Sequence, residues 1–243
     1  MFEQLISFLE NAGFTKVESQ LDFLLNPETL PFAIWETLYA PLAATILAYV
    51  IGLPLGVLLV TGSQDGIHPL PRWLMRGLNI LVNLLRSVPF LILMVLVMPL
   101  SRMVLGTAIG TSATIVPLTV AAFPYIARLV EGSLREMDRG ILEAAESMGC
   151  STLQIVTKVM LPECRPSLLV GATNACITIL GYGAMAGAIG GGGLGAIALM
   201  RGYSRNQTLV LYVAVLLLVI MVQILQTIGS KLAIRSDKRI SHK

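Results

Sequence analysis

Side chains that commonly carry out acid-base or nucleophilic catalysis are sparse in this chain of 243 residues. His68 and His242 are its only histidines, and neither lies in a long apolar segment, so a serine there would have no histidine base. The three cysteines lack the paired short spacing of a zinc site, and no metal centre is predicted. The chain is therefore not predicted to be an enzyme.

Glycines are concentrated in one segment, where GYGAMAGAIGGGGLG runs from residue 181 to 195. Three of them match the dinucleotide fingerprint G-x-G-x-x-G, but that site needs an acidic residue about 20 residues downstream. No Asp or Glu lies between Glu163 and Asp237, so the fingerprint is rejected. Glycines instead permit close helix packing, as at a dimer interface or a gate. The residues assigned to such gating or packing are Gly181, Gly183, Gly187, Gly190 and Gly195.

Most of the chain consists of long apolar segments, which would carry the candidate functional residues. Hydrophobic residues make up 55% of the chain and charged residues 13%, about half the charge of an ordinary globular protein. Crossing a bilayer takes roughly 20 apolar residues, and lipid offers backbone groups no partner outside their own helix. Gly52, Pro54 and Gly56 permit bends in the first such stretch, and Pro89 in the second. The sequence predicts an all-α membrane protein with five transmembrane helices near residues 35–60, 77–100, 111–130, 167–190 and 207–230.

Basic residues predict the orientation, because loops that face the cytoplasm carry an excess of Lys and Arg. Twelve of the 17 basic residues fall on the side of the first loop, the third loop and the tail 232–243 together with Lys231, four fall on the other side, and Arg86 lies within a predicted span. The N-terminus is therefore expected outside and the basic tail inside. Residues 1–30 are predicted to form an external amphipathic segment with a helix that ends near Asn26 and Pro27.

The loop 139–165 is predicted to contain two short helices. Residues 143–148 favour a helix, Gly149 can adopt the left-handed conformation that ends it, and Ser151 can cap the next helix. Pro162 is expected to end that second helix. A short exposed helix with small side chains suits a groove on a partner protein, but it can also rest on the bilayer surface or on its own bundle. The apolar face of the second helix is expected to comprise Leu153, Val156 and Val159 or Met160.

The same loop resembles the EAA loop of the permeases of binding-protein-dependent ABC importers. That pattern has EAA, three residues, Gly, nine residues, a branched apolar residue, one residue and Leu-Pro. The resemblance covers residues 37–231, a type I ABC importer transmembrane domain, and implies that the loop is a coupling helix docked in a cleft of a cytoplasmic ATPase. Valine in place of isoleucine is the only departure, and the matching residues are Glu143, Ala144, Ala145, Gly149, Val159, Leu161 and Pro162.

Further stretches are similar to the permeases of methionine importers, among them VIGLPLGVLL at residues 50–59 and LGYGAMAGAIGGGGLGAIA at 180–198. The resemblance implies a multi-pass protein of a bacterial inner membrane, surrounded by lipid, that pairs with a second copy of itself. It also implies an ABC ATPase dimer and an external lipoprotein that delivers D- or L-methionine. The chain has no P-loop sequence, so ATP and Mg²⁺ are expected on the ATPase, with no cofactor in this chain. Nucleic-acid binding has no support.

Candidate residues of a translocation pathway lie on one face of the fourth predicted span. Their spacing of four, four and three residues aligns them, and their polar and sulfur groups suit a transient cavity. The same stripe also suits a packed helix interface. These residues are Asn174, Thr178, Tyr182 and Met185.

Two other functions compete with this interpretation. The cargo can be another small amino acid, because a binding protein can supply the specificity. Alternatively, the chain is an autonomous secondary carrier or channel. Proton coupling usually needs an intramembrane carboxylate, and the acid considered for this role is Glu36, at the outer edge of the first span. Arg86, about half-way along the second predicted span, either contacts substrate or reaches helix-terminal carbonyls, and the second role is favoured.

Overall fold

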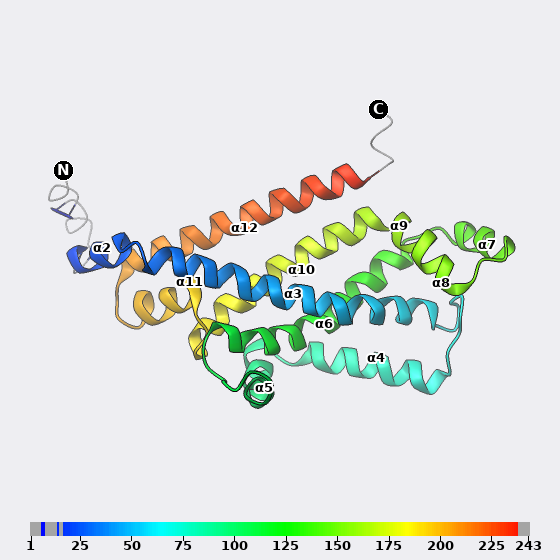
Figure 1. The fold of residues 1–243 in the computed structure, drawn as a ribbon, viewed down its shortest axis with the longest axis horizontal. Helices are drawn as coiled ribbons and strands as arrows, with labels where there is room; N and C mark the ends of the chain where they lie inside the picture. The colour runs from blue at the N-terminus through cyan, green and yellow to red at the C-terminus, as the bar shows by residue number, and fades with distance from the viewer. Residues whose placement is uncertain (1–5, 8–13, 15–16, 238–243) are drawn as a thin grey trace. The chain divides into compact units, whose positions relative to one another are not determined.

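The computed structural model describes residues 6–7, 14 and 17–237, and within them the chain is helical (Figure 1). Parts of the predicted terminal segments 1–30 and 232–243, including His242, lie outside the described residues. The helices are α2 (Val17–Leu25), α3 (Thr29–Thr61), α4 (Arg72–Ser87), α5 (Phe90–Leu105), α6 (Thr111–Arg135), α7 (Arg139–Ser147), α8 (Thr152–Gln154), α9 (Leu161–Glu163), α10 (Arg165–Ala186), α11 (Gly193–Ala196) and α12 (Thr208–Ser236). The turns η1 (Ile155–Met160) and η3 (Ile197–Tyr203) are π-helical, and η2 (Gly187–Ile189) is a 3-10 turn.

Among the described residues, four helices are long and apolar enough to cross a bilayer: α3, α6, α10 together with η2, and α12. Each overlaps a predicted span. The predicted span 77–100 is instead two helices, α4 and α5, whose axes differ by 109° across a short break and which supply at most one further span. Pro89 causes the break, because Val88 before it is extended, with φ −79° and ψ 127°. Arg86 consequently lies in the last turn of α4, where a positive charge favours the terminal carbonyls.

The chain packs as two compact units. Unit 1 comprises Met1–Ala44, Met94–Leu118 and Thr178–Ile224, and unit 2 comprises Thr45–Leu93, Thr119–Ile177 and Leu225–Lys243. The core of unit 1 forms around Ala33, Leu194 and Met221. The core of unit 2 forms around Leu59, Met75, Val82 and Ala127.

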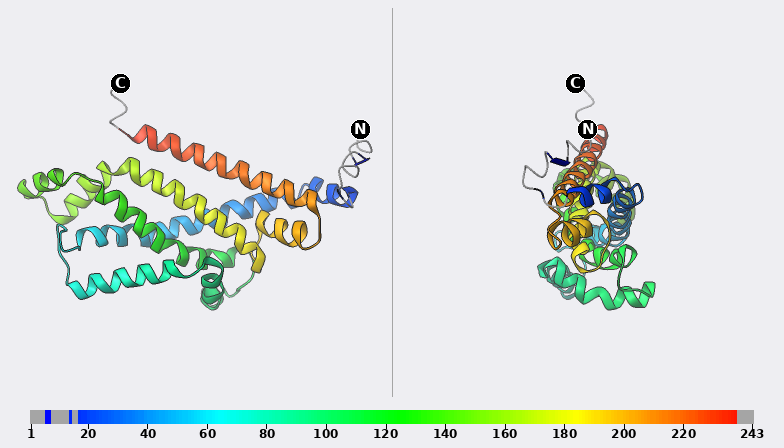
Figure 2. Two further views of the ribbon diagram at one scale, coloured as in Figure 1. Left: turned by 180° about the vertical axis from the view of Figure 1, so that it is seen from behind. Right: turned by 90° about the vertical axis from the view of Figure 1, so that its left-hand side faces the viewer.

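In unit 1, α2 is attached to the first turn of α12, as Figure 2 shows from two sides. Gln20 is 1% exposed, and its side-chain oxygen accepts hydrogen bonds from the amides of Leu209 at 2.9 Å and Val210 at 3.2 Å. These amides lack partners within their own helix, so Gln20 caps α12. The guanidinium of Arg201 lies 3.9 Å from the centre of the Phe23 ring and adds a cation–π contact. The described part of the predicted N-terminal segment is therefore an integral part of unit 1.

In unit 2, α3 and α6 pack closely through two glycines one turn apart. A Cβ atom at Gly52 would lie 2.8 Å from the Phe123 carbonyl oxygen, and one at Gly56 would lie 2.6 Å from that of Ala127. Such a small-residue spacing lets helix backbones approach in membranes. α3 runs without a break through Pro54, and these glycines serve helix packing.

Candidate functional site

The loop with the EAA-like sequence folds in unit 2 as a helix, a tight turn and a second helix. α7 begins after Asp138, whose side chain accepts a hydrogen bond from the Gly140 amide at 2.8 Å. At its end Gly149 has φ +76°, a conformation that glycine adopts without strain. Ser151 forms a reciprocal cap with Gln154, since the Ser151 amide donates to Gln154 Oε1 at 2.8 Å and the Gln154 amide donates to Ser151 Oγ. The left-handed turn at Gly149 and the cap at Ser151 are confirmed.

The second helix extends further than predicted. It continues through Pro162 and ends at Glu163, so the expected stop after Leu161 is wrong. Proline has no amide to donate, so it removes one backbone hydrogen bond from the helix that contains it. Pro162 lies in the first turn of α9, directly after the π-helical turn η1.

The π-helical turn also changes which residues of the second helix face inward. In this turn the Leu161 amide bonds to the carbonyl of Val156, five residues earlier, whereas an α-helix uses a spacing of four. Ile155 and Met160, five apart, are therefore the buried residues, at 2% and 1% exposure, and Leu153 is 73% exposed. The predicted single apolar face is split, and Ile155 was missed.

α7 presents three apolar side chains to the outside. Ile141, Ala144 and Met148 lie at spacing i, i+3 and i+7 and are all exposed, Met148 by 76%. We call these three residues the α7 stripe. Glu143 is exposed beside it, whereas Ala145 is buried and holds α7 against unit 2. Ala144 was predicted to contact a partner, whereas Ile141 and Met148 were not, although their helical spacing indicates a shared face.

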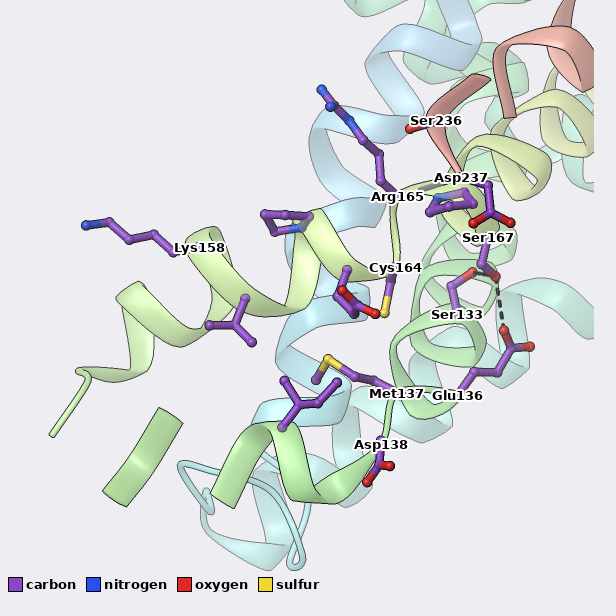
Figure 3. Close-up of a pocket in the computed structure, with 15 residues that line it drawn as sticks. Ser133, Glu136, Met137, Asp138, Lys158, Cys164, Arg165, Ser167, Ser236 and Asp237 are labelled. Atoms are coloured by element: carbon purple, nitrogen blue, oxygen red, sulfur yellow. Dashed lines mark hydrogen bonds between the residues drawn. The ribbon is translucent and has the colours of Figure 1, made fainter. Parts of the chain in front are cut away.

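A cavity of about 440 Å³ adjoins this segment within unit 2 (Figure 3). At its wall Ser167 Oγ lies 2.9 Å from Ser133 Oγ and 3.1 Å from Glu136 Oε2, which joins the start of α10 to the end of α6. Lys158 and Cys164 also line this cavity. The chain that enters α7 and the chain that leaves α9 are thus held together at the base of the segment.

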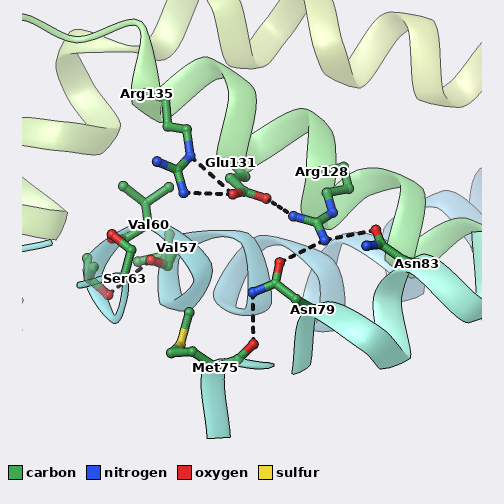
Figure 4. A network of polar contacts seen from close by, with 10 residues as sticks. Val57, Val60, Ser63, Met75, Asn79, Asn83, Arg128, Glu131 and Arg135 are labelled. Carbon is green, nitrogen blue, oxygen red and sulfur yellow. Dashed lines mark hydrogen bonds and ion pairs between the residues drawn. The ribbon is translucent and has the colours of Figure 1, made fainter. Parts of the chain in front are cut away.

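A second polar network joins α4 to α6 in unit 2 (Figure 4). Glu131 is 9% exposed and accepts hydrogen bonds from Arg128 at 2.5 Å and Arg135 at 3.0 Å. Arg128 also donates to Asn79 Oδ1 at 2.8 Å and Asn83 Oδ1 at 2.9 Å. A buried carboxylate is tolerated when charged partners and hydrogen bonds satisfy it in this way. The spacing of the two arginines from Glu131 indicates their pairing in a helix, although it was not predicted. The contacts of Arg128 with the two asparagines become evident only in the folded chain.

The candidate pathway residues share one side of α10, as their spacing predicted. Asn174 and Met185 are exposed, and Thr178 and Tyr182 are half-buried. Other residues of the same helix are buried, namely Gly171, Ala175, Ile179, Leu180 and Ala186. The stripe is therefore not the face that α10 buries most deeply in the single chain.

Three of the predicted packing glycines lie at close contacts in unit 1. A Cβ at Gly183 would lie 2.9 Å from a proline ring on α3, and Cβ atoms at Gly187 and Gly195 would overlap the facing backbone. Gly190 has φ +97°, whereas the space around Gly181 is open. No group of three His, Cys, Asp or Glu arranged to hold a metal occurs in the part of the chain that the structure describes.

Comparison with protein families places most of this chain in one of them. Residues 52–241 match the family described as "Binding-protein-dependent transport system inner membrane component". A relative from Vibrio cholerae, named "Probable D-methionine transport system permease protein MetI", is 46% identical over 218 residues, covering 89% of this chain and 96% of that protein. The Escherichia coli K12 D-methionine permease MetI is 46% identical over 154 residues, covering 63% of this chain and 70% of that protein.

Solved structures give the same result for the fold. A chain of the MetNI methionine ABC transporter, described as inward facing, superposes with a TM-score of 0.84 at 42% identity and covers 86% of this chain and 96% of its own. A chain of an amino acid ABC transporter crystallised with histidines has a TM-score of 0.63 at 20% identity, with 84% of this chain and 94% of that chain covered, and supports the fold alone. The predicted all-α fold of a type I ABC importer transmembrane domain is confirmed.

Proposed function

We propose that this chain, which belongs to the family of binding-protein-dependent transport system inner membrane components, is the permease subunit of an ATP-driven importer of methionine. The 46% identity to a permease named for D-methionine transport carries the proposal, because the match spans 96% of that protein. A shared fold alone would support no cargo, as the 20% identical amino acid transporter illustrates. D- or L-methionine is therefore the proposed cargo.

The α7 stripe is the proposed contact with a cytoplasmic ABC ATPase. An apolar face on a short capped helix suits insertion into a groove, and Glu143 beside it can pair with a basic residue on the partner. The reciprocal cap at Ser151 and the bonds of Ser167 to α6 support transmission, because they fix the segment to the helices on either side of it. In this proposal Gly149, Val159, Leu161 and Pro162 maintain the shape of the segment.

The orientation of the chain follows from the same proposal. An ATPase that binds α7 must lie in the cytoplasm, which is the side that the distribution of Lys and Arg also favours. The N-terminus and α2 then face the external side of the inner membrane, where a lipoprotein delivers methionine. The C-terminal tail lies on the cytoplasmic side.

The translocation pathway is proposed to run between this chain and a second copy of itself. Asn174 and Met185 are exposed on the single chain, so their polar and sulfur groups lie at its surface. Thr178 and Tyr182 extend the same stripe. A second copy placed against this stripe would enclose a path for an amino acid.

The transport cycle requires two arrangements of the permease. ATP shifts the equilibrium only if it binds the complex more tightly in one arrangement than in the other. The similar MetNI chains are described as inward facing, and we assign this chain to the same resting arrangement.

Affinity purification of the tagged chain from its native membrane tests the function. We expect a stoichiometric ATPase to accompany it and methionine-loaded binding protein to stimulate ATP hydrolysis. Parallel assays with D-methionine, L-methionine and other small amino acids identify the cargo. Stimulation by a different amino acid would correct the cargo, and recovery of the chain without an ATPase in several mild detergents would contradict the importer.

A further inference from the structure

The carboxylate of Glu36 joins three segments of unit 1 that are far apart in the sequence. Glu36 Oε1 accepts a hydrogen bond from the Thr111 hydroxyl at the start of α6, at 2.5 Å. Glu36 Oε2 accepts one from the Gly193 amide at the start of α11, at 2.8 Å. The neighbouring Thr37 hydroxyl accepts the Leu194 amide at 2.8 Å and donates to the Ala33 carbonyl at 2.7 Å. Two consecutive residues of α3 therefore bind two consecutive amides of α11.

These bonds hold a stretch of non-helical backbone. The helix that begins with α10 ends after η2, and the next helix starts at Gly193, which leaves Gly190 to Gly192 irregular. We call residues 190–194 the glycine-rich turn. Irregular backbone in an apolar surrounding persists only when protein groups satisfy its amides and carbonyls. Here Glu36 and Thr37 supply acceptors for the turn, and the Gly190 carbonyl accepts the Gly110 amide at 2.9 Å.

The glycine-rich turn lies so close to α3 and α6 that side chains do not fit. A Cβ at Gly192 would lie 2.5 Å from Glu36 Oε2 and would overlap the Thr111 hydroxyl. A Cβ at Gly193 would lie 2.6 Å from the Thr37 hydroxyl, and φ of +79° there also favours glycine. The carboxylate thus meets the start of a helix directly, where exposed amides favour a negative charge.

We infer that Glu36 is a positioning residue for transport, which latches the glycine-rich turn to α3 and α6 in the resting arrangement and must release it when the permease changes conformation. The inference rests on the proposed function. A turn rich in glycine can adopt a second backbone conformation at little cost, so its position depends on the bonds that Glu36 and Thr37 make. Bonds made in only one of two arrangements shift the equilibrium between them.

Two measurements on the complete complex in lipid nanodiscs test the latch. The rate of hydrogen exchange in a peptide containing Gly193 and Leu194 reports whether their amides are bonded to Glu36 and Thr37. The rate of ATP hydrolysis reports on the transport cycle. Loss of a charge-assisted bond in Glu36→Ala is expected to speed this exchange about ten-fold or more. The same variant is expected to raise ATP hydrolysis without binding protein, and to lower the stimulation ratio about five-fold or more.

Three further variants control for a general loss of structure. Thr111→Val removes one hydroxyl at nearly constant volume and is expected to shift both readouts in the same direction by a smaller factor. Glu36→Gln keeps one carbonyl acceptor and is expected to restore part of the stimulation ratio. Glu28→Gln alters an exposed carboxylate in the same unit and is expected to match the wild type in both measurements.

Two results would overturn the inference. Unchanged exchange in Glu36→Ala would show that Glu36 does not hold the turn. Faster exchange with a wild-type stimulation ratio would show that the contact is structural only. If no ATPase accompanies the wild-type chain, the proposed function fails and the role of the latch in transport fails with it, while exchange still decides whether Glu36 seats the turn.

Discussion

The α7–α9 segment and the glycine-rich turn are held in opposite ways. The turn and the cap within the first are formed by bonds between near neighbours, such as those of Ser151 and Gln154, and the segment leaves an apolar stripe exposed. The second is held by Glu36, which bonds to Thr111, 75 residues away, and to Gly193, 157 residues away. The glycine-rich turn also leaves no room for a Cβ at Gly192 or Gly193. A locally held segment keeps its shape while another protein pulls on it. A turn held by distant side chains changes position when those few bonds break.

The largest expected effect comes from placing a charged side chain at the turn of the locally held segment. Gly149→Asp introduces a carboxylate beside the α7 stripe and a side chain at φ +76°, which costs about 1–2 kcal/mol. Methionine uptake is expected to fall about ten-fold or more at equal membrane level, because the charge opposes docking. Gly149→Asn is the matched control, since asparagine tolerates this conformation without a charge. Full uptake in Gly149→Asp would count against a docking role.

An added methyl group is expected to have different effects at Gly192, in the glycine-rich turn, and at Gly181, where the space is open. Gly192→Ala is expected to destabilise the purified chain by about 1–3 kcal/mol, because the added Cβ collides with Glu36 and Thr111. Gly181→Ala, in the same glycine cluster, meets no atom within 4 Å and is expected to be near neutral. Thermal denaturation of both variants in one detergent checks the difference. Equal denaturation temperatures for the two variants would show that the glycine-rich turn does not pack against Glu36 and Thr111.

The stripe itself can be altered without touching the turn. Met148→Glu replaces a side chain that is 76% exposed, so the fold of the chain is expected to persist. Binding to the ATPase is expected to weaken about ten-fold, by loss of apolar contact. Met148→Leu keeps an apolar group and should bind normally. Co-purification at a series of detergent concentrations measures the change, and wild-type retention in Met148→Glu would place the contact elsewhere.

The smallest effect is expected at the local cap. Ser151→Ala removes the hydroxyl that accepts the Gln154 amide and is expected to cost about 1 kcal/mol, confined to the second helix. Hydrogen exchange over residues 152–160 should rise about five-fold, with no change at the glycine-rich turn. Ser151→Asp retains an acceptor and should exchange at the wild-type rate. A change that spreads to residues 190–194 would contradict the local character of this segment.

Sequence patterns anticipated the locally held segment better than the turn. Gly149 and Ser151 were predictable because a left-handed glycine and a capping serine act within a few residues of chain. The π-helical turn was not, and it moved the buried face to Ile155 and Met160 and carried the helix past Pro162. Backbone hydrogen bonding of this kind leaves little trace in hydrophobic spacing.

The long-range contacts were beyond the reach of sequence patterns. Glu36 stood out as an acid at the edge of a predicted span, but its partners, Thr111 and Gly193, are known only once α6 and α11 are placed. The same holds for Asn79 and Asn83, which bind Arg128 across two helices. Pro89 was predicted to permit a bend, but the angle of 109° between the axes of α4 and α5 is larger than the kink that a proline produces within one helix.

Uptake into proteoliposomes tests the central claim most directly. The purified complex is reconstituted with ATP inside the vesicles, and labelled methionine with its binding protein is added outside. We predict accumulation that requires both ATP and the binding protein and that is lost with a non-hydrolysable analogue. Methionine accumulation driven by an ion gradient alone, with no ATPase present, would contradict this account and identify the chain as an autonomous carrier.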